Sequence, residues 1–102
     1  MSAPDELPDG LVLARTTPVF DRSNVPAGLL RAHQVAEGVW GRLVVHEGTV
    51  TFVFEDDPDH PRHGDRGDRI VIPPGRPHHV ELDDSAAFAV EFHRPPSDSH
   101  TT

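Results

Sequence analysis

The sequence predicts an all-β domain of the small sandwich or barrel type. Short apolar runs rich in β-branched residues recur at roughly even spacing, and turn-forming residues separate them, a pattern typical of such folds. The chain has eleven prolines and eight glycines among its 102 residues, and no segment carries a helical pattern longer than about two turns. Its length predicts a single domain, residues 10–94, between a mobile acidic tail at 1–9 and a polar, disordered tail at 95–102.

The first half of the domain is expected to be mostly extended. Four segments are predicted to be strands or extended chain: residues 11–15, 16–20, 39–46 and 49–54. The last two are the most strand-like, because one is rich in valine and the other alternates with period two. Glu47-Gly48 between them is a hairpin turn signal. Residues 28–35 fit a strand or one helical turn, and a strand is preferred because Gly28 and Gly38 bracket the segment closely.

The second half alternates strands and turns after one long polar stretch. Residues 55–68 contain no apolar side chain except prolines, so they are expected to form a solvated loop. Residues 70–72 (IVI) are typical of a strand, residues 73–75 (PPG) end it, and a second strand is expected to begin at His78. Residues 86–93 alternate, which predicts a strand with its phenylalanines and a valine on one face.

Composition and charge exclude several classes of function. There are no cysteines, so neither a disulfide framework nor a thiolate metal site is possible. Seventeen acidic against nine basic residues leave a net charge of −8. That argues against nucleic acid or an anionic membrane as a partner, since both require basic patches. No apolar run approaches the ~20 residues of a membrane span, and the N-terminus lacks a basic-then-apolar signal segment, so a cytoplasmic location is expected.

The strand–corner–strand stretch carries the spacing of a known motif. Gly67, Pro73, Gly75 and His78 follow one another with five, one and two residues between them. This spacing resembles the second motif of the cupin family, whose histidine is a metal ligand. The resemblance implies a jelly-roll fold and points to His78.

The order of several weaker motifs resembles the small cupins of the tellurite-resistance protein B (TehB) type, which include YeaR-like domains of unknown function. The resemblance extends from about residue 7 to residue 96. The matching segments are residues 17–20 (TPVF), 30–33 (LRAH), 38–43 (GVWGRL), 47–48 (EG), 78–81 (HHVE) and the apolar strand 88–92.

These histidines predict a metal site. His33 and His78 are expected to bind a divalent transition metal, zinc first, with manganese, nickel or iron as alternatives. Glu81 is expected to be a third ligand or to fix the tautomer of an imidazole. In a regular strand Glu81 faces away from His78, an objection that a bulge after the proline corner would remove. Gly41 stands where the first cupin motif has a glutamate, which argues against redox catalysis.

Trp40 and Arg42 share one face of the segment 39–46 and are expected to line a pocket with one cation for a small-molecule or oxyanion ligand. The structural alternative is a packed indole and an arginine whose aliphatic stem covers the sheet edge.

Three functions remain open: a metal-binding, stress-response module, a metal-dependent isomerase or dioxygenase, and a metal-free domain that works as a homodimer. The first is favoured because the ligands of the first cupin motif are missing.

Overall fold

The computed structural model describes residues 6–30 and 38–96, which form eight β-strands and one short 3-10 helix. In chain order these are β1 (Val12–Thr16), β2 (Phe20–Asp21), η1 (Ala27–Leu30), β3 (Trp40–Glu47), β4 (Thr49–Phe54), β5 (Arg62–Asp65), β6 (Arg69–Ile72), β7 (His78–Leu82) and β8 (Ala87–Arg94). The predicted all-β class is therefore confirmed. No helix in these two ranges is long and apolar enough to cross a membrane.

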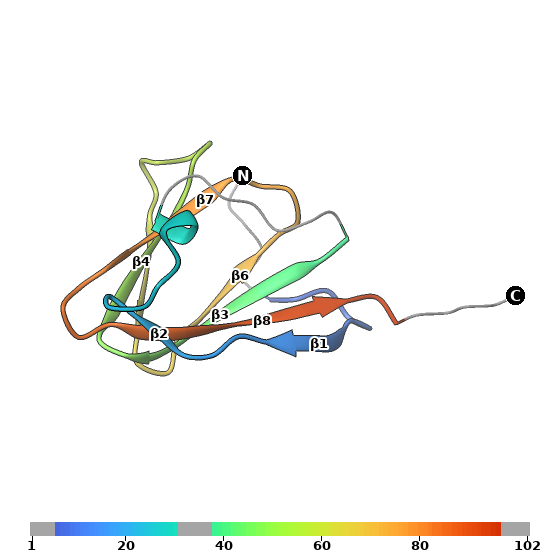
Figure 1. The fold of residues 1–102 in the computed structure, drawn as a ribbon. Coiled ribbons are helices and arrows are strands. Elements are labelled where there is room, and N and C mark those ends of the chain that lie inside the picture. The colour runs from blue at the N-terminus through green and yellow to red at the C-terminus, as the bar shows by residue number, and fades with distance from the viewer. Residues whose placement is uncertain (1–5, 31–37, 97–102) are drawn as a thin grey trace, which may run out of the picture.

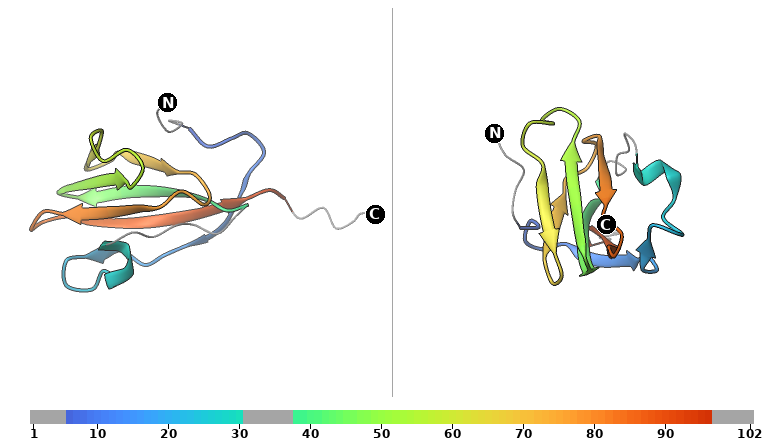
Figure 2. Two further views of the ribbon diagram at one scale, coloured as in Figure 1. Left: turned by 90° about the horizontal axis from the view of Figure 1, so that it is seen from above. Right: turned by 90° about the vertical axis from the view of Figure 1, so that its left-hand side faces the viewer.

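The strands form two antiparallel sheets that face each other (Figure 1, Figure 2). The first sheet has the order β1-β8-β3-β6, with β2 also paired to β8, and the second has the order β5-β4-β7. The chain changes sheet between β3 and β4, and again at each connection from β5 to β8. Such repeated crossing between two layers is the connectivity of a small jelly-roll sandwich, as predicted.

The core lies between the sheets and is filled by every second side chain of the strands. Phe52 on β4 and Phe88 on β8 come from opposite sheets, and both are completely buried. Phe20 packs edge-on against Phe88, with 5.8 Å between the ring centroids. Burying each such aromatic side chain stabilises the fold by about 1.5–3 kcal/mol. The buried cluster comprises Leu43, Val45, Val50, Phe52, Phe54, Ile70, Ile72, Val80, Ala86, Phe88 and Val90.

The hairpin expected at Glu47-Gly48 is wrong. β3 pairs with β6 and β8, whereas β4 pairs with β5 and β7, so the two strands belong to different sheets. Gly48 turns the chain from one sheet to the other with a left-handed φ of 64°. A period-two pattern shows that one face of a strand is buried, but it does not identify the neighbouring strand.

The long polar stretch also contains a strand, β5, where only a loop was expected. β5 pairs with β4, and polar side chains link the two strands on their outer face. Thr51 Oγ1 lies 3.1 Å from His63 Nδ1, and Thr49 Oγ1 donates to Asp65 at 2.8 Å. The inward face carries Arg62, which is half-buried, and Gly64, which is buried near side chains of β3 and β6. β5 therefore has no apolar side chain that would have revealed it.

The preference for a strand at residues 28–35 is wrong where the structure describes this segment. Residues 27–30 form η1 instead, because Pro26 presets a helical φ and its carbonyl accepts a hydrogen bond from Leu29 N at 3.0 Å. Leu29 packs against the core, and η1 lies beside β7. The remainder of the predicted strand lies outside the described residues.

Candidate functional site

His78 stands at the start of β7 with its imidazole between the two sheets, and only 3% of the residue is exposed. The ring stacks on Phe52 with 4.8 Å between centroids and 26° between planes. It meets Phe54 edge-on at 6.5 Å. The corner at residues 73–77 brings the chain here from β6 in the first sheet to β7 in the second. The expected strand–corner–strand geometry is confirmed, and its first imidazole faces the core.

A backbone carbonyl determines which nitrogen of His78 carries a proton. Nδ1 lies 2.9 Å from the carbonyl oxygen of Arg76. A carbonyl only accepts hydrogen bonds, so Nδ1 is the donor, and the lone pair of the neutral ring is on Nε2. Metal-binding histidines commonly donate their second ring N–H to a backbone carbonyl in this way. His78 therefore has the tautomer that ligation through Nε2 requires.

Glu81 lies on the opposite face of β7. β7 pairs with β4 without a register shift, so His78 and Val80 face the core while His79 and Glu81 face outward. The side chain of Glu81 is 64% exposed, and its carboxylate lies 3.1 Å from His79 Nε2. His79 Nδ1 is hydrogen-bonded to Glu55, and this bond raises the pKa of His79 above its usual value. The structure thus brings Glu81 to His79 and not to His78.

The expectation for His33 falls on a segment outside the described residues. Within residues 6–30 and 38–96, no three histidine, cysteine, aspartate or glutamate side chains are grouped to hold a metal ion. His78 is a buried imidazole of the described residues whose tautomer suits ligation through Nε2. A tetrahedral site needs further donors, which would come from elsewhere in the chain, from water or from a bound ligand.

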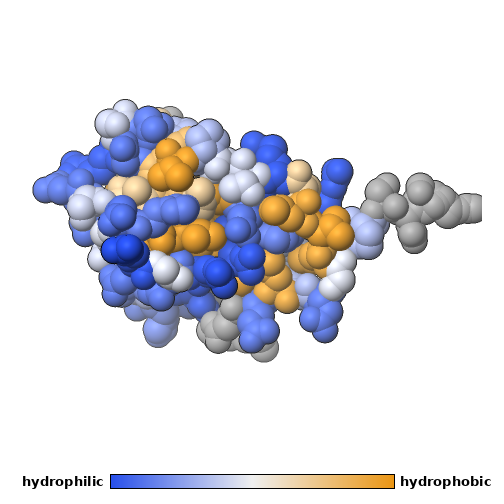
Figure 3. All heavy atoms as spheres, turned by 90° about the horizontal axis from the view of Figure 1, so that it is seen from below, coloured by the Kyte–Doolittle hydropathy of each residue, from blue (hydrophilic) through white to orange (hydrophobic). Residues whose placement is uncertain are grey.

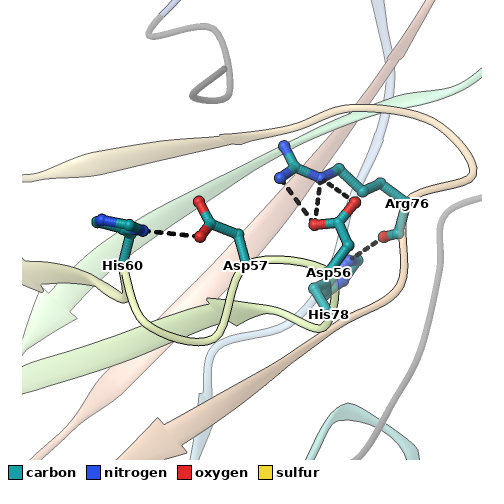
Figure 4. A network of polar contacts seen from close by, with 5 residues as sticks. All are labelled: Asp56, Asp57, His60, Arg76 and His78. Carbon is teal, nitrogen blue, oxygen red and sulfur yellow. Dashed lines mark hydrogen bonds and ion pairs between the residues drawn. The ribbon is translucent and has the colours of Figure 1, made fainter.

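An ion pair that sequence reasoning missed holds the corner next to His78 (Figure 4). Arg76 donates from Nε to the two carboxylate oxygens of Asp56 at 3.0 and 3.1 Å, and from Nη2 to one of them at 2.8 Å. Its guanidinium carbon lies 3.8 Å from the ring centroid of Phe54. The available signal was an arginine among turn residues and an acidic loop elsewhere in the chain, which does not identify the partner.

Arg42 takes part in a polar network on the outer face of the first sheet. Its Nε and Nη2 lie 2.8 and 2.7 Å from Glu91 Oε1, and His93 Nε2 lies 3.1 Å from the same oxygen. Burial by itself would raise the pKa of Glu91, but hydrogen bonds from His93 and Arg42 outweigh it and hold this pKa below its usual value. Much of the charge of Arg42 is therefore compensated within the sheet.

Arg42 also lines a surface pocket of about 340 Å³. Trp40 is half-buried on the same face of β3, but it is not among the described residues that line this pocket. The face lies outside the sandwich, whereas His78 lies inside it, so the residues predicted as pocket and as metal site do not converge. The lining comprises Glu6, Leu7, Arg42, Arg69 and Val71.

Known proteins resemble this chain over most of its length. The family model of the TehB-like domain matches residues 15–90. The uncharacterized protein YeaR of Escherichia coli (strain K12) is 28% identical over 96 residues, which cover 85% of this chain and 81% of that protein. A crystal structure of a structural-genomics target from the same strain has a TM-score of 0.83 at 28% identity, covering 89% of this chain and 97% of that one.

Two further solved structures share the fold. TehB from Haemophilus influenzae has a TM-score of 0.77 at 24% identity, covering 85% of this chain but 32% of TehB. A cupin-2 domain containing protein from Shewanella frigidimarina has a TM-score of 0.50 at 21% identity, covering 84% of this chain and 67% of that one. The cupin architecture expected from the sequence is confirmed by these likenesses. With its family model matched over residues 15–90, the chain belongs to the TehB-like domain family.

Proposed function

We propose that this chain is a small ligand-binding cupin module that holds a divalent transition metal at His78, with zinc as the first candidate. The observation that supports this is the buried imidazole of His78, whose Nδ1–H donates a hydrogen bond to the carbonyl of Arg76. His33 is the proposed second imidazole. A bound divalent metal would act as a Lewis acid for an oxygen atom of an oxyanion or small molecule. A stress-response role of the tellurite-resistance type is proposed from the family.

The free-energy cost of burying a polar side chain also supports a role for His78 beyond packing. The ring lies in an aromatic environment made by Phe52 and Phe54. Burying a polar group costs about 1–3 kcal/mol more than burying an apolar one unless hydrogen bonds compensate. An imidazole at this position is therefore better explained by what its nitrogens bind than by the shape of its ring.

Metal analysis of tag-free protein tests the proposal. The wild-type chain is expected to bind one Zn²⁺ per molecule in a dye-competition titration, and His78→Gln is expected to lose that site. His79→Gln is the matched control, since it changes the adjacent imidazole on the outer face of the same strand. Circular dichroism confirms that each variant is folded. Equal zinc content in His78→Gln and in the wild type would remove the site.

Turnover separates a binding module from the metal-dependent enzyme of the alternative hypothesis. Metal-loaded protein would be assayed for oxygen consumption and for isomerisation with a panel of small hydroxy and keto compounds. A binding module is expected to show none above the metal-free control. Turnover that disappears in His78→Gln would instead favour the isomerase or dioxygenase.

Self-association through β1 is a second candidate function. β1 is an edge strand of the first sheet, and Val12 and Leu13 on it are 45% and 56% exposed. The view from below shows apolar side chains gathered at the end of the molecule where β8 finishes and β1 begins (Figure 3). An exposed apolar edge favours pairing with another strand, here that of a second copy. Sedimentation velocity should show a dimer that Leu13→Lys dissociates. Val19 is 47% exposed and lies outside a strand, so Val19→Lys should leave the dimer intact.

A further inference from the structure

We propose that Asp56 and Arg76 are positioning residues that hold His78 in its Nδ1–H tautomer. Neither touches a metal or ligand in this scheme, and both act through the backbone carbonyl of residue 76. The inference rests on the proposed function only in its consequence for metal binding. The tautomer of His78 is a property of the metal-free chain and is measured separately.

The first link joins the polar loop after β4 to the corner before β7 (Figure 4). Glu55 N donates to the carbonyl of Pro77 at 2.9 Å, which fixes the two backbones beside each other. Asp56 then accepts three hydrogen bonds from Arg76, at 2.8, 3.0 and 3.1 Å. The guanidinium carbon of Arg76 also lies 3.8 Å from the ring centroid of Phe54. The guanidinium is therefore held in place by both a carboxylate and an aromatic face.

The second link joins Arg76 to the imidazole. The carbonyl of the same arginine accepts the Nδ1 proton of His78 at 2.9 Å (Figure 4). Stacking on Phe52 holds the plane of the ring, with 26° between the two planes. The ring plane and the carbonyl together determine where Nε2 points.

The backbone of the corner is restricted on the C-terminal side of Arg76 but not on its N-terminal side, so the Asp56–Arg76 ion pair is needed to hold it. Pro77 restricts the conformation of Arg76 on the C-terminal side. On the N-terminal side Gly75 has a φ of 70°, and no atom outside its chain neighbours lies within 4 Å of the place where its Cβ would be. Glycine lacks the steric barrier that would hold this bend. The side chain of Arg76, anchored on Asp56, therefore supplies the restraint that keeps the carbonyl directed at His78.

Long-range ¹H–¹⁵N NMR of the histidine rings in metal-free protein tests the positioning role. Wild-type His78 is expected to show the Nδ1–H tautomer alone, and Asp56→Ala and Arg76→Gln are expected to populate the Nε2–H tautomer. Asp57→Ala is the matched control, because Asp57 is the next carboxylate in the loop and bonds His60 instead, at 2.7 Å. Asp56→Glu should restore the wild-type spectrum. An unchanged His78 tautomer in folded Asp56→Ala would overturn the proposal, and Asp56→Asn replaces that variant should it fail to fold.

Loss of the positioning contact should also weaken zinc binding. Loss of a group that orients a metal-binding histidine typically weakens metal binding by about 10–100-fold, so Asp56→Ala should lie at least about tenfold below the wild type and Asp57→Ala should match it. The two proposals fail differently. A shifted tautomer with no zinc binding in any protein would retain the positioning role and remove the metal site. Zinc bound equally by wild type and Asp56→Ala, with the tautomer unchanged, would retain the metal site and remove the positioning role.

Discussion

Replacing Gly48 by alanine should destabilise the fold far more than the same replacement at Gly75. Both glycines have left-handed backbone conformations, with φ of 64° and 70°. That conformation costs about 1–2 kcal/mol for any residue with a Cβ, and the cost applies equally at both sites. The gain of about 0.4–1 kcal/mol from a less flexible unfolded chain is also common to both. The difference between the two variants therefore measures steric surroundings alone.

Those surroundings differ sharply. A Cβ at Gly48 would lie 2.6 Å from Ala86 N and 2.7 Å from both Ser85 C and Asp83 Oδ1. Two of these atoms are backbone and cannot rotate away, so the turn before β8 must move. Overpacking of this kind costs about 1–3 kcal/mol. At Gly75 no such contact exists within 4 Å.

Urea denaturation followed by far-ultraviolet circular dichroism measures the difference. Gly48→Ala should have a free energy of unfolding about 1–3 kcal/mol below that of Gly75→Ala, with an unchanged m-value. In a domain of this size, that corresponds to a melting temperature lower by about 10 °C. Equal midpoints for the two variants would refute the claim that the turn before β8 leaves no room for a Cβ at Gly48.

Three further predictions concern single side chains. Phe52→Ala should lower the free energy of unfolding by about 3–5 kcal/mol in urea denaturation, because the ring is fully buried. Hydrogen bonding to Glu55 raises the pKa of His79 in the folded protein above the ordinary histidine value of 6.5. The contact therefore stabilises the fold fully at a pH below 6.5, and this stabilisation is lost as the pH rises through the raised pKa. The urea midpoint of the wild type should consequently fall more between about pH 6 and about pH 9 than that of His79→Gln, and equal slopes would contradict this. Arg42→Gln should raise the pKa of Glu91, which a ¹³C carboxyl titration detects, because burial is then opposed by fewer hydrogen bonds.

The sequence predicted the fold well where burial produces a pattern. In β8, Phe88 and Val90 face the core and Glu91 faces outward, as the alternation indicates. The same reasoning missed β5, since the residues on its inward face are Arg62 and the buried Gly64, and neither is an apolar side chain. It also joined β3 and β4 in one hairpin, because a turn signal at Gly48 fits a sharp corner between sheets as well as a hairpin.

The candidate site was likewise predicted only in part from the sequence. Strand parity indicated that His78 and Glu81 face opposite sides of β7, and the structure has no bulge that would change this. The clamp of Asp56 on Arg76 joins residues 20 positions apart, with β5 and β6 between them in the chain, and no periodicity connects them. Local pattern therefore identified the imidazole, while the contact that orients it depends on tertiary structure.

The central place of β8 in the first sheet has a consequence for biosynthesis. β8 pairs with β1 and β2 on one side and with β3 on the other, and its register with β1 brings Arg94 opposite Val12. A ribosome delivers this strand last of all the described ones, so the earlier strands emerge with open edges and no partner to close them. Nascent chains that stop short of β8 would present those edges to one another. Premature termination should accordingly yield insoluble material rather than a smaller working module.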